Sequence, residues 1–163
     1  MSDSLPTAAQ LAKHPRVFVH DHPLLHHKLA SLRRPGTDTP TFRARLSEVA
    51  GLMVWAATRD LPTQAVSVRT PLETTTGKEL ACPVTVVPVL RAGLGMSEGV
   101  LHVMPEARVG HLGMARDEET LEPRTYLRRL PSDLDAGPVF LVDPMLATGG
   151  SAVAAAAVLR EAG

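Results

Sequence analysis

Two stretches near the amino end carry apolar residues at the three- and four-residue spacing of an amphipathic helix. In residues 21–34 the periodic positions are Leu25, Leu29 and Leu32. A longer stripe runs through residues 41–60, with Phe42, Leu46, Val49, Met53 and Ala57 as its members. Thr39 followed by Pro40 predicts an N-cap and a first helical position. We expect two helices here, with Phe42, Trp55 and the periodic methionines in the core.

Other stretches have the patterns of strands. Residues 84–89 and 139–142 are short runs rich in β-branched residues, which predict buried strands, the first interrupted by Pro88. Residues 65–69 alternate, and residues 70–80 form a loop or a hairpin with them. Residues 108–115 and 124–130 predict two strands around an acidic loop. Helices are expected after Gly93 and through the alanine-rich run that follows Ser151.

Strands that alternate with helices indicate an α/β domain with a largely parallel sheet, carrying an antiparallel hairpin at residues 108–130. The length of 163 residues is enough for one domain with a sizeable core. We expect residues 1–16 to be a loose tail and residues 17–163 to form the domain.

One stretch, residues 137–159, combines a strand, a tight loop and a helix start. Gly149 and Gly150 allow backbone N–H groups to approach a phosphate, and a helix N-terminus favours an anion. Thr148 and Ser151 add hydroxyl donors, and Asp143 stands at the carboxyl end of the strand, where open α/β sheets bind ligands. A Gly-Gly pair can also merely turn the chain. The pattern does not favour a Walker A loop, because no Lys follows the glycines to reach the β- and γ-phosphates.

A second glycine-rich loop follows residues 84–89. Its three glycines have the spacing G-x-G-x-x-x-G, one residue longer than the dinucleotide-binding fingerprint, so a nicotinamide or flavin enzyme is an alternative. Arg91 in this loop offers a planar fork to phosphate oxygens, although a surface ion pair would explain it as well. Two such loops suit a sugar that carries a phosphate at one end and a pyrophosphate at the other.

Arg116 begins a charged loop that contains Glu118, Glu119 and Glu122. It is either a solvated hairpin tip or a mobile loop that closes over a substrate. The histidines gather near the amino end, at His14, His20, His22, His26 and His27, without the carboxylate or cysteine partners that a metal site needs.

The composition indicates which partners and which cellular compartment to expect. The 17 basic and 17 acidic side chains balance, so no global charge favours nucleic acid or an anionic membrane. One cysteine, Cys82, excludes an internal disulfide and fits a reducing compartment. The amino end lacks the apolar core of a signal peptide, and no apolar run approaches a membrane span, so we expect a cytoplasmic protein.

With these motifs in view, the chain resembles the uracil phosphoribosyltransferases of the type I phosphoribosyltransferase fold. VFLVDPMLATGGSA is similar to that family's signature for phosphoribosyl pyrophosphate (PRPP), VVPVLRAGLGM to its pyrophosphate loop, and GMARDEETLEP to its flexible loop. HPLLHHKLASLR resembles its N-terminal helix. The resemblance runs from about His22 to Gly163, and the three loop motifs occur in the family's order at matching separations.

The resemblance implies transfer of the 5-phosphoribosyl group of PRPP to uracil, giving UMP and pyrophosphate in pyrimidine salvage. It implies that Arg91, Arg116 and Asp143 are catalytic, and that PRPP is bound by these three residues together with Pro144, Met145, Leu146, Ala147, Thr148, Gly149, Gly150 and Ser151. It also implies Mg²⁺ carried by PRPP rather than held by the protein, a homo-oligomer and, in parts of the family, activation by GTP. Another base as substrate, or a PRPP-binding regulator, stays open as an alternative.

The family recognises uracil mainly through a segment that follows the PRPP helix, and this chain stops at Gly163. We therefore expect a C-terminally incomplete sequence that lacks the base-binding part. The alternative is a truncated protein that binds PRPP poorly and catalyses little.

Overall fold

The computed structural model describes residues 13–116 and 123–163. Its elements, in chain order, are α2 (Pro23–Leu32), α3 (Thr39–Ala57), β1 (Thr63–Arg69), β2 (Thr74–Leu80), β3 (Thr85–Leu90), α4 (Leu94–Val103), β4 (Arg108–Val109), β5 (His111–Arg116), β6 (Pro123–Arg129), the short 3₁₀ helix η1 (Leu134–Ala136), β7 (Val139–Val142) and α5 (Gly150–Glu161). Every helix and strand expected from the pattern is present, except that the single strand expected at residues 108–115 is divided into β4 and β5.

The central sheet is built around β3. Strands β4, β5 and β7 all pair with β3 in parallel, and β6 pairs with β5 antiparallel, which confirms the largely parallel sheet with one hairpin. The Pro88 position does not interrupt β3. Proline lacks an N–H, but the parallel pairing with β7 continues through Pro88 opposite Val142, where the side chain is fully buried.

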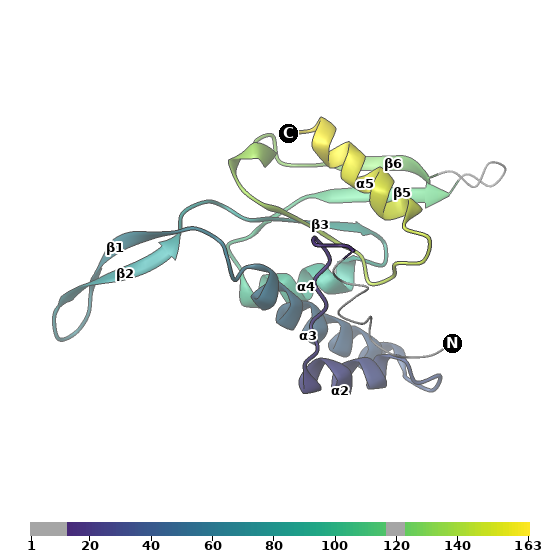
Figure 1. Ribbon diagram of the computed structural model, residues 1–163, viewed down its shortest axis with the longest axis horizontal. Helices are drawn as coiled ribbons and strands as arrows, with labels where there is room; N and C mark the ends of the chain where they lie inside the picture. The colour runs from purple at the N-terminus through teal and green to yellow at the C-terminus, as the bar shows by residue number, and fades with distance from the viewer. Residues whose placement is uncertain (1–12, 117–122) are drawn as a thin grey trace.

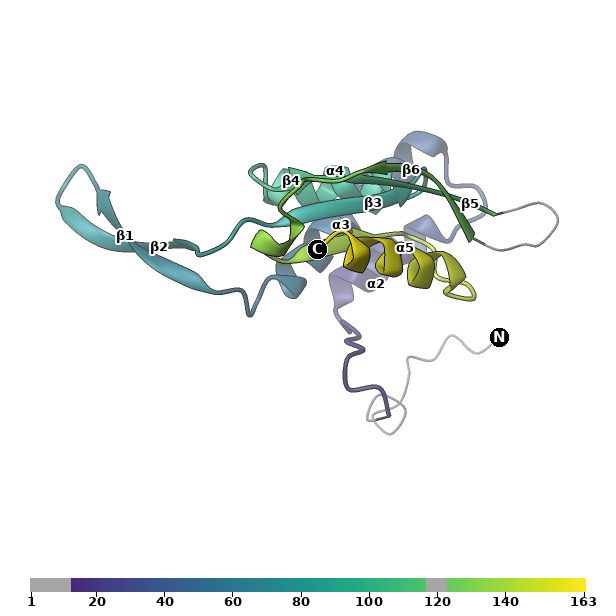
Figure 2. The ribbon, with the colours of Figure 1, turned by 90° about the horizontal axis from the view of Figure 1, so that it is seen from above.

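Helices cover the two faces of this sheet unequally. Helices α3 and α4 pack on the face that carries Val84 and Val86, while α5 packs on the face of Val87 and Val89. Figures 1 and 2 both show α4 and α5 on opposite sides of β3. Because β3 is covered on both faces, its apolar run is continuous rather than alternating.

Strand β7 lies at the margin of this sheet rather than in its centre. Its four residues are all half-buried, and among the described strands it pairs with β3 alone. The prediction of a buried strand was right for β3 and too strong for β7, because an apolar run does not reveal whether a strand has neighbours on one side or on both.

The apolar stripe of α3 differs from the predicted one. Its buried residues are Leu46, Val49, Ala50 and Val54, whereas Phe42 is 42% exposed and Trp55 is 74% exposed. The expectation that these two aromatic residues belong to the core is therefore wrong. The N-cap is Asp38, whose carboxylate accepts from the Thr41 backbone N–H at 2.7 Å, and not Thr39.

Strands β1 and β2 form an antiparallel hairpin that we call the arm (Thr63–Leu80). Seven pairs of residues join the two strands, and the turn between them lies at residues 70–73. Both views show the arm projecting away from the sheet and helices (Figures 1 and 2). None of its strand residues is buried.

Candidate functional site

The carboxyl ends of the parallel strands bring the predicted site residues to one edge of the sheet. Arg91 follows β3, Asp143 follows β7, and Arg116 is the last residue of β5. Figure 1 shows the arrows of β3 and β5 pointing toward the same edge, beside which α5 begins. Three segments that are far apart in sequence therefore meet where open α/β sheets bind ligands.

A cavity of about 220 Å³ lies in the loop between β7 and α5. Its lining contains Asp143 and every predicted residue from Met145 to Ser151, and adds Ala152, which the sequence did not single out. Pro144 is absent from this lining. Ala152 belongs to the first turn of α5, so the helix start itself was the signal that could have found it.

The start of α5 has a backbone geometry that suits an anion. Gly149 has φ +80°, a left-handed conformation that glycine adopts without strain, and it turns the chain into the helix. No side chain of the described chain caps this helix start. The first-turn N–H groups are thus available to an anion at the favourable end of the helix dipole.

Asp143 is tied into the same loop. Its Oδ1 accepts from the Met145 backbone N–H at 3.0 Å, so that the carboxylate orients the chain that follows it. The side chain is half-buried, while Met145 and Leu146 beyond it are exposed at 76% and 77%. A carboxylate at the mouth of a phosphate-binding loop suits a ligand with hydroxyl groups next to a phosphate.

Arg91 is exposed on the neighbouring loop, after a cis peptide bond between Leu90 and Arg91. It does not line the 220 Å³ cavity but leaves the sheet from the strand next to β7. Arg116 pairs through its backbone with Pro123 across the hairpin. The acidic loop with Glu118, Glu119 and Glu122 lies outside the described residues.

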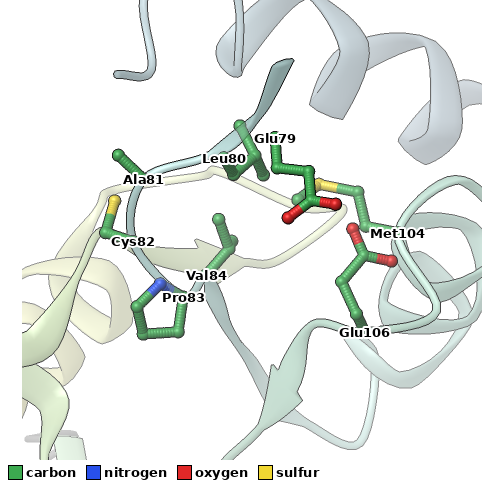
Figure 3. Close-up of a pocket in the computed structure, with 8 residues that line it drawn as sticks. All are labelled: Glu79, Leu80, Ala81, Cys82, Pro83, Val84, Met104 and Glu106. Carbon is green, nitrogen blue, oxygen red and sulfur yellow. The ribbon is translucent and has the colours of Figure 1, made fainter. Parts of the chain in front are cut away.

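A second cavity, of about 630 Å³, opens at the base of the arm (Figure 3). It is lined by Glu79, Leu80, Ala81, Cys82, Pro83, Val84, Met104 and Glu106. Figure 3 shows the two carboxylates on the same side of this cavity, beside Met104. It lies at the amino end of β3, and its negative charges would repel a phosphate, so the smaller cavity is the better candidate for a phosphorylated substrate.

The fold and this loop edge define a phosphoribosyltransferase-like α/β protein. A model of the family "Uracil phosphoribosyltransferase" matches residues 19–163, and the chain belongs to that family.

Several known proteins are similar to the chain. The uracil phosphoribosyltransferase of Streptococcus pneumoniae serotype 4 (strain ATCC BAA-334 / TIGR4) is 50% identical over 149 residues, which cover 91% of this chain and 71% of the relative. That of Dictyoglomus turgidum is 51% identical over 148 residues, covering 90% and 72%. The solved structure of the AQ2163 protein from Aquifex aeolicus superposes with a TM-score of 0.82 at 38% identity, covering 88% of this chain and 69% of that one.

Among the described residues, no helix is both long and apolar enough to span a membrane.

Proposed function

We propose that the chain transfers the 5-phosphoribosyl group of PRPP to N1 of uracil, giving UMP and pyrophosphate in pyrimidine salvage. Membership of the uracil phosphoribosyltransferase family carries this proposal. The uncapped start of α5 beside Asp143 supports it, because one loop then offers donors to a phosphate and a carboxylate to the adjoining ribose.

The residues of this loop have separate roles in the proposal. The backbone N–H groups of Gly150 and Ser151, with the hydroxyls of Thr148 and Ser151, hold the 5′-phosphate. Pro144 ends β7, and Met145, Leu146 and Ala147 with Gly149 shape the turn around the ribose phosphate. Asp143 faces the ribose hydroxyls.

Asp143 also acts on the reacting carbon. The bond between C1′ and the pyrophosphate oxygen breaks as uracil N1 bonds to C1′; the oxygen keeps the electron pair, and the N1 proton passes to the departing pyrophosphate. Positive charge develops on the ribose ring in such an oxocarbenium-like transition state. A nearby carboxylate favours that charge, and its orientation by the Met145 N–H keeps it in place.

Arg91 and Arg116 act on the opposite end of PRPP. Their guanidinium groups neutralise the charge that gathers on the departing pyrophosphate. The cavity lining contains one carboxylate, Asp143, which fits a Mg²⁺ ion that arrives with substrate phosphates rather than one held by a protein cage. Mg²⁺, when bound to PRPP, supplies further positive charge against the leaving group.

Incubation of the full-length protein with PRPP, Mg²⁺ and one base at a time tests the substrate. We expect uracil to give UMP with an equal amount of pyrophosphate, and orotate and hypoxanthine to give no nucleotide. Reactions without PRPP, or with excess chelator, are the controls. The proposal fails if uracil yields no UMP, or if another base is converted faster.

We also propose that GTP is an effector, as it is in parts of the family. GTP added to the uracil reaction should then increase the rate of UMP formation.

We also propose that the chain forms a homo-oligomer through the arm. An isolated two-stranded hairpin is marginally stable in water, and both outer edges of the arm are unpaired among the described strands. Val66 and Val68 lie together on one face, next to Gly77, and Leu72 at the turn is 96% exposed. A second copy of the chain would cover this apolar surface.

A further inference from the structure

The two substrate loops are in direct contact at Gly93. Strands β3 and β7 run side by side until Pro88 stands opposite Val142, and each chain then leaves the sheet as a loop. Gly93 lies two residues after Arg91, at the start of α4, and is buried. Its N–H donates to the Val89 carbonyl at 2.8 Å. The β7 side of the contact is the backbone carbonyl of Val142, the residue that comes just before Asp143.

There is no room for a side chain at this contact. A Cβ atom on Gly93 would lie 2.5 Å from the Val142 carbonyl oxygen, 2.8 Å from the Val89 nitrogen and 2.9 Å from the Val89 oxygen. All three are backbone atoms at the ends of paired strands, so they cannot turn aside as a side chain can. The φ of Gly93 is −66°, which any residue adopts. The glycine is thus required for close approach and not for its backbone conformation.

We propose that Gly93 is a positioning residue that holds the Arg91 loop against the end of β7 and so sets the separation of Arg91 from Asp143. This inference rests on the proposed function, in which one PRPP molecule reaches from the loop that carries Arg91 to the loop that begins at Asp143. Its pyrophosphate and its ribose 5-phosphate are joined covalently, so the two loops must keep one distance. A displacement of about 1 Å in such a site can lower the rate about 10²-fold.

The variant Gly93→Ala tests this role against the control variant Gly36→Ala. Gly36 lies in the turn after α2, outside the loops that the proposed function uses, and a Cβ there meets no atom within 4 Å. We expect Gly93→Ala to weaken PRPP binding at least about tenfold and to lower kcat by up to about 10²-fold. Gly36→Ala should stay within about threefold of the parent for both.

Binding of the two halves of the substrate separates positioning from general damage. Inorganic pyrophosphate with Mg²⁺, and ribose 5-phosphate, each need one loop only. We expect Gly93→Ala to bind each fragment within about threefold of the parent, while its affinity for PRPP falls. Equal weakening of both fragments and PRPP, or unchanged PRPP affinity, would overturn the proposal. None of these binding measurements involves uracil, so failure of the base assay and failure of this inference are distinguishable.

A second variant keeps the test open if Gly93→Ala does not fold. Ala92→Gly adds no atom, and Ala92 is exposed next to Gly93. The added backbone freedom loosens the link between Arg91 and Gly93. We expect several-fold weaker PRPP binding with fragment binding unchanged; PRPP affinity equal to the parent's would contradict the role of a fixed spacing.

Discussion

At the scale of single residues, Asp143 combines two roles that substitutions can separate. Its Oδ1 accepts a hydrogen bond from the Met145 backbone N–H, which stabilises the loop. Its negative charge is the feature that the proposed chemistry uses. An asparagine keeps an acceptor oxygen in the same place but carries no charge. An alanine removes both.

We expect Asp143→Asn to lower kcat about 10²–10³-fold, by analogy with the loss of one charge-stabilising group from an active site. The thermal midpoint should stay close to that of the parent because the turn is retained. Asp143→Ala should lower kcat as far and also weaken PRPP binding, because the loop loses its internal hydrogen bond. Steady-state kinetics and thermal melts measure these effects, and a kcat for Asp143→Asn within about threefold of the parent would contradict the role of the charge.

Asp38 shows how a single carboxylate holds a helix start. The Thr41 backbone N–H donates to its Oδ1 at 2.7 Å, and this hydrogen bond holds the pKa of Asp38 below its ordinary value of 3.8. Because the folded-state pKa is lowered, the stabilisation is present above pH 3.8 and is lost as pH falls through the folded-state pKa.

We therefore expect Asp38→Ala to lower the thermal midpoint by a few degrees at neutral pH, with Asp38→Asn close to the parent because asparagine caps equally well. Thermal melts from pH 7 to pH 3 check the sign. The difference in thermal midpoint between the parent and Asp38→Ala should shrink at the acid end. The difference between Asp38→Asn and Asp38→Ala should stay the same, because asparagine does not titrate. An advantage of the parent that does not change with pH would contradict the ionic part of the cap.

At the scale of elements, helices α2 and α3 are joined by a charged cluster. Glu48 accepts from Lys28 of α2 at 2.7 Å and from Arg45 of α3 at 2.7 Å. Hydrogen bonds from Lys28 and then Arg45 lower the pKa of Glu48. The sequence pattern predicted both helices from their apolar faces, but it contained no sign that these three side chains meet, since Lys28 and Glu48 are twenty residues apart.

The stripe of α3 was predicted only in part, for the same reason. Leu46 and Val49 are buried as expected, but Phe42 is exposed and Val54 is buried in its place among the core residues. A period of 3.6 residues fits either set. Which set is buried depends on where α4 and β3 lie. Trp55, the one tryptophan of the chain, is exposed because it falls on the side of α3 that those elements leave free.

At the scale of the whole molecule, the arm is the part with the least packing against the rest of the chain. It is long and paired along its length, yet none of its strand residues is buried. Burial of Val66 and Val68 by a second copy would add the apolar contact that the hairpin lacks.

Light scattering during size-exclusion chromatography tests the oligomer. We expect the parent to have at least twice the 17.4 kDa of one chain, and Val68→Glu to shift it toward the monomer. Ser67→Glu, which places the same charge on the opposite face of β1, is the control and should shift it less. A parent that is monomeric at all concentrations, or equal shifts in both variants, would contradict assembly through this face.

The sequence by itself determined the order of helices and strands and the parallel sheet with its hairpin, and it predicted a phosphate-binding loop after residue 142. These depend on local rules: periodicity, β-branched runs, and glycines before a helix. Motif resemblance added the family and the roles proposed for Arg91, Arg116 and Asp143.

Only the tertiary structure decided how these pieces face one another. It showed β7 with β3 as its one partner among the described strands, Trp55 in solvent, the arm apart from the core and Gly93 against the Val142 carbonyl. Each depends on atoms that are distant in sequence, and close packing gives such contacts an energy that local composition does not contain. The sequence predicted Gly93 only as the place where a helix begins. The position of β7 makes Gly93 the point of contact between the loop that carries Arg91 and the loop that begins at Asp143.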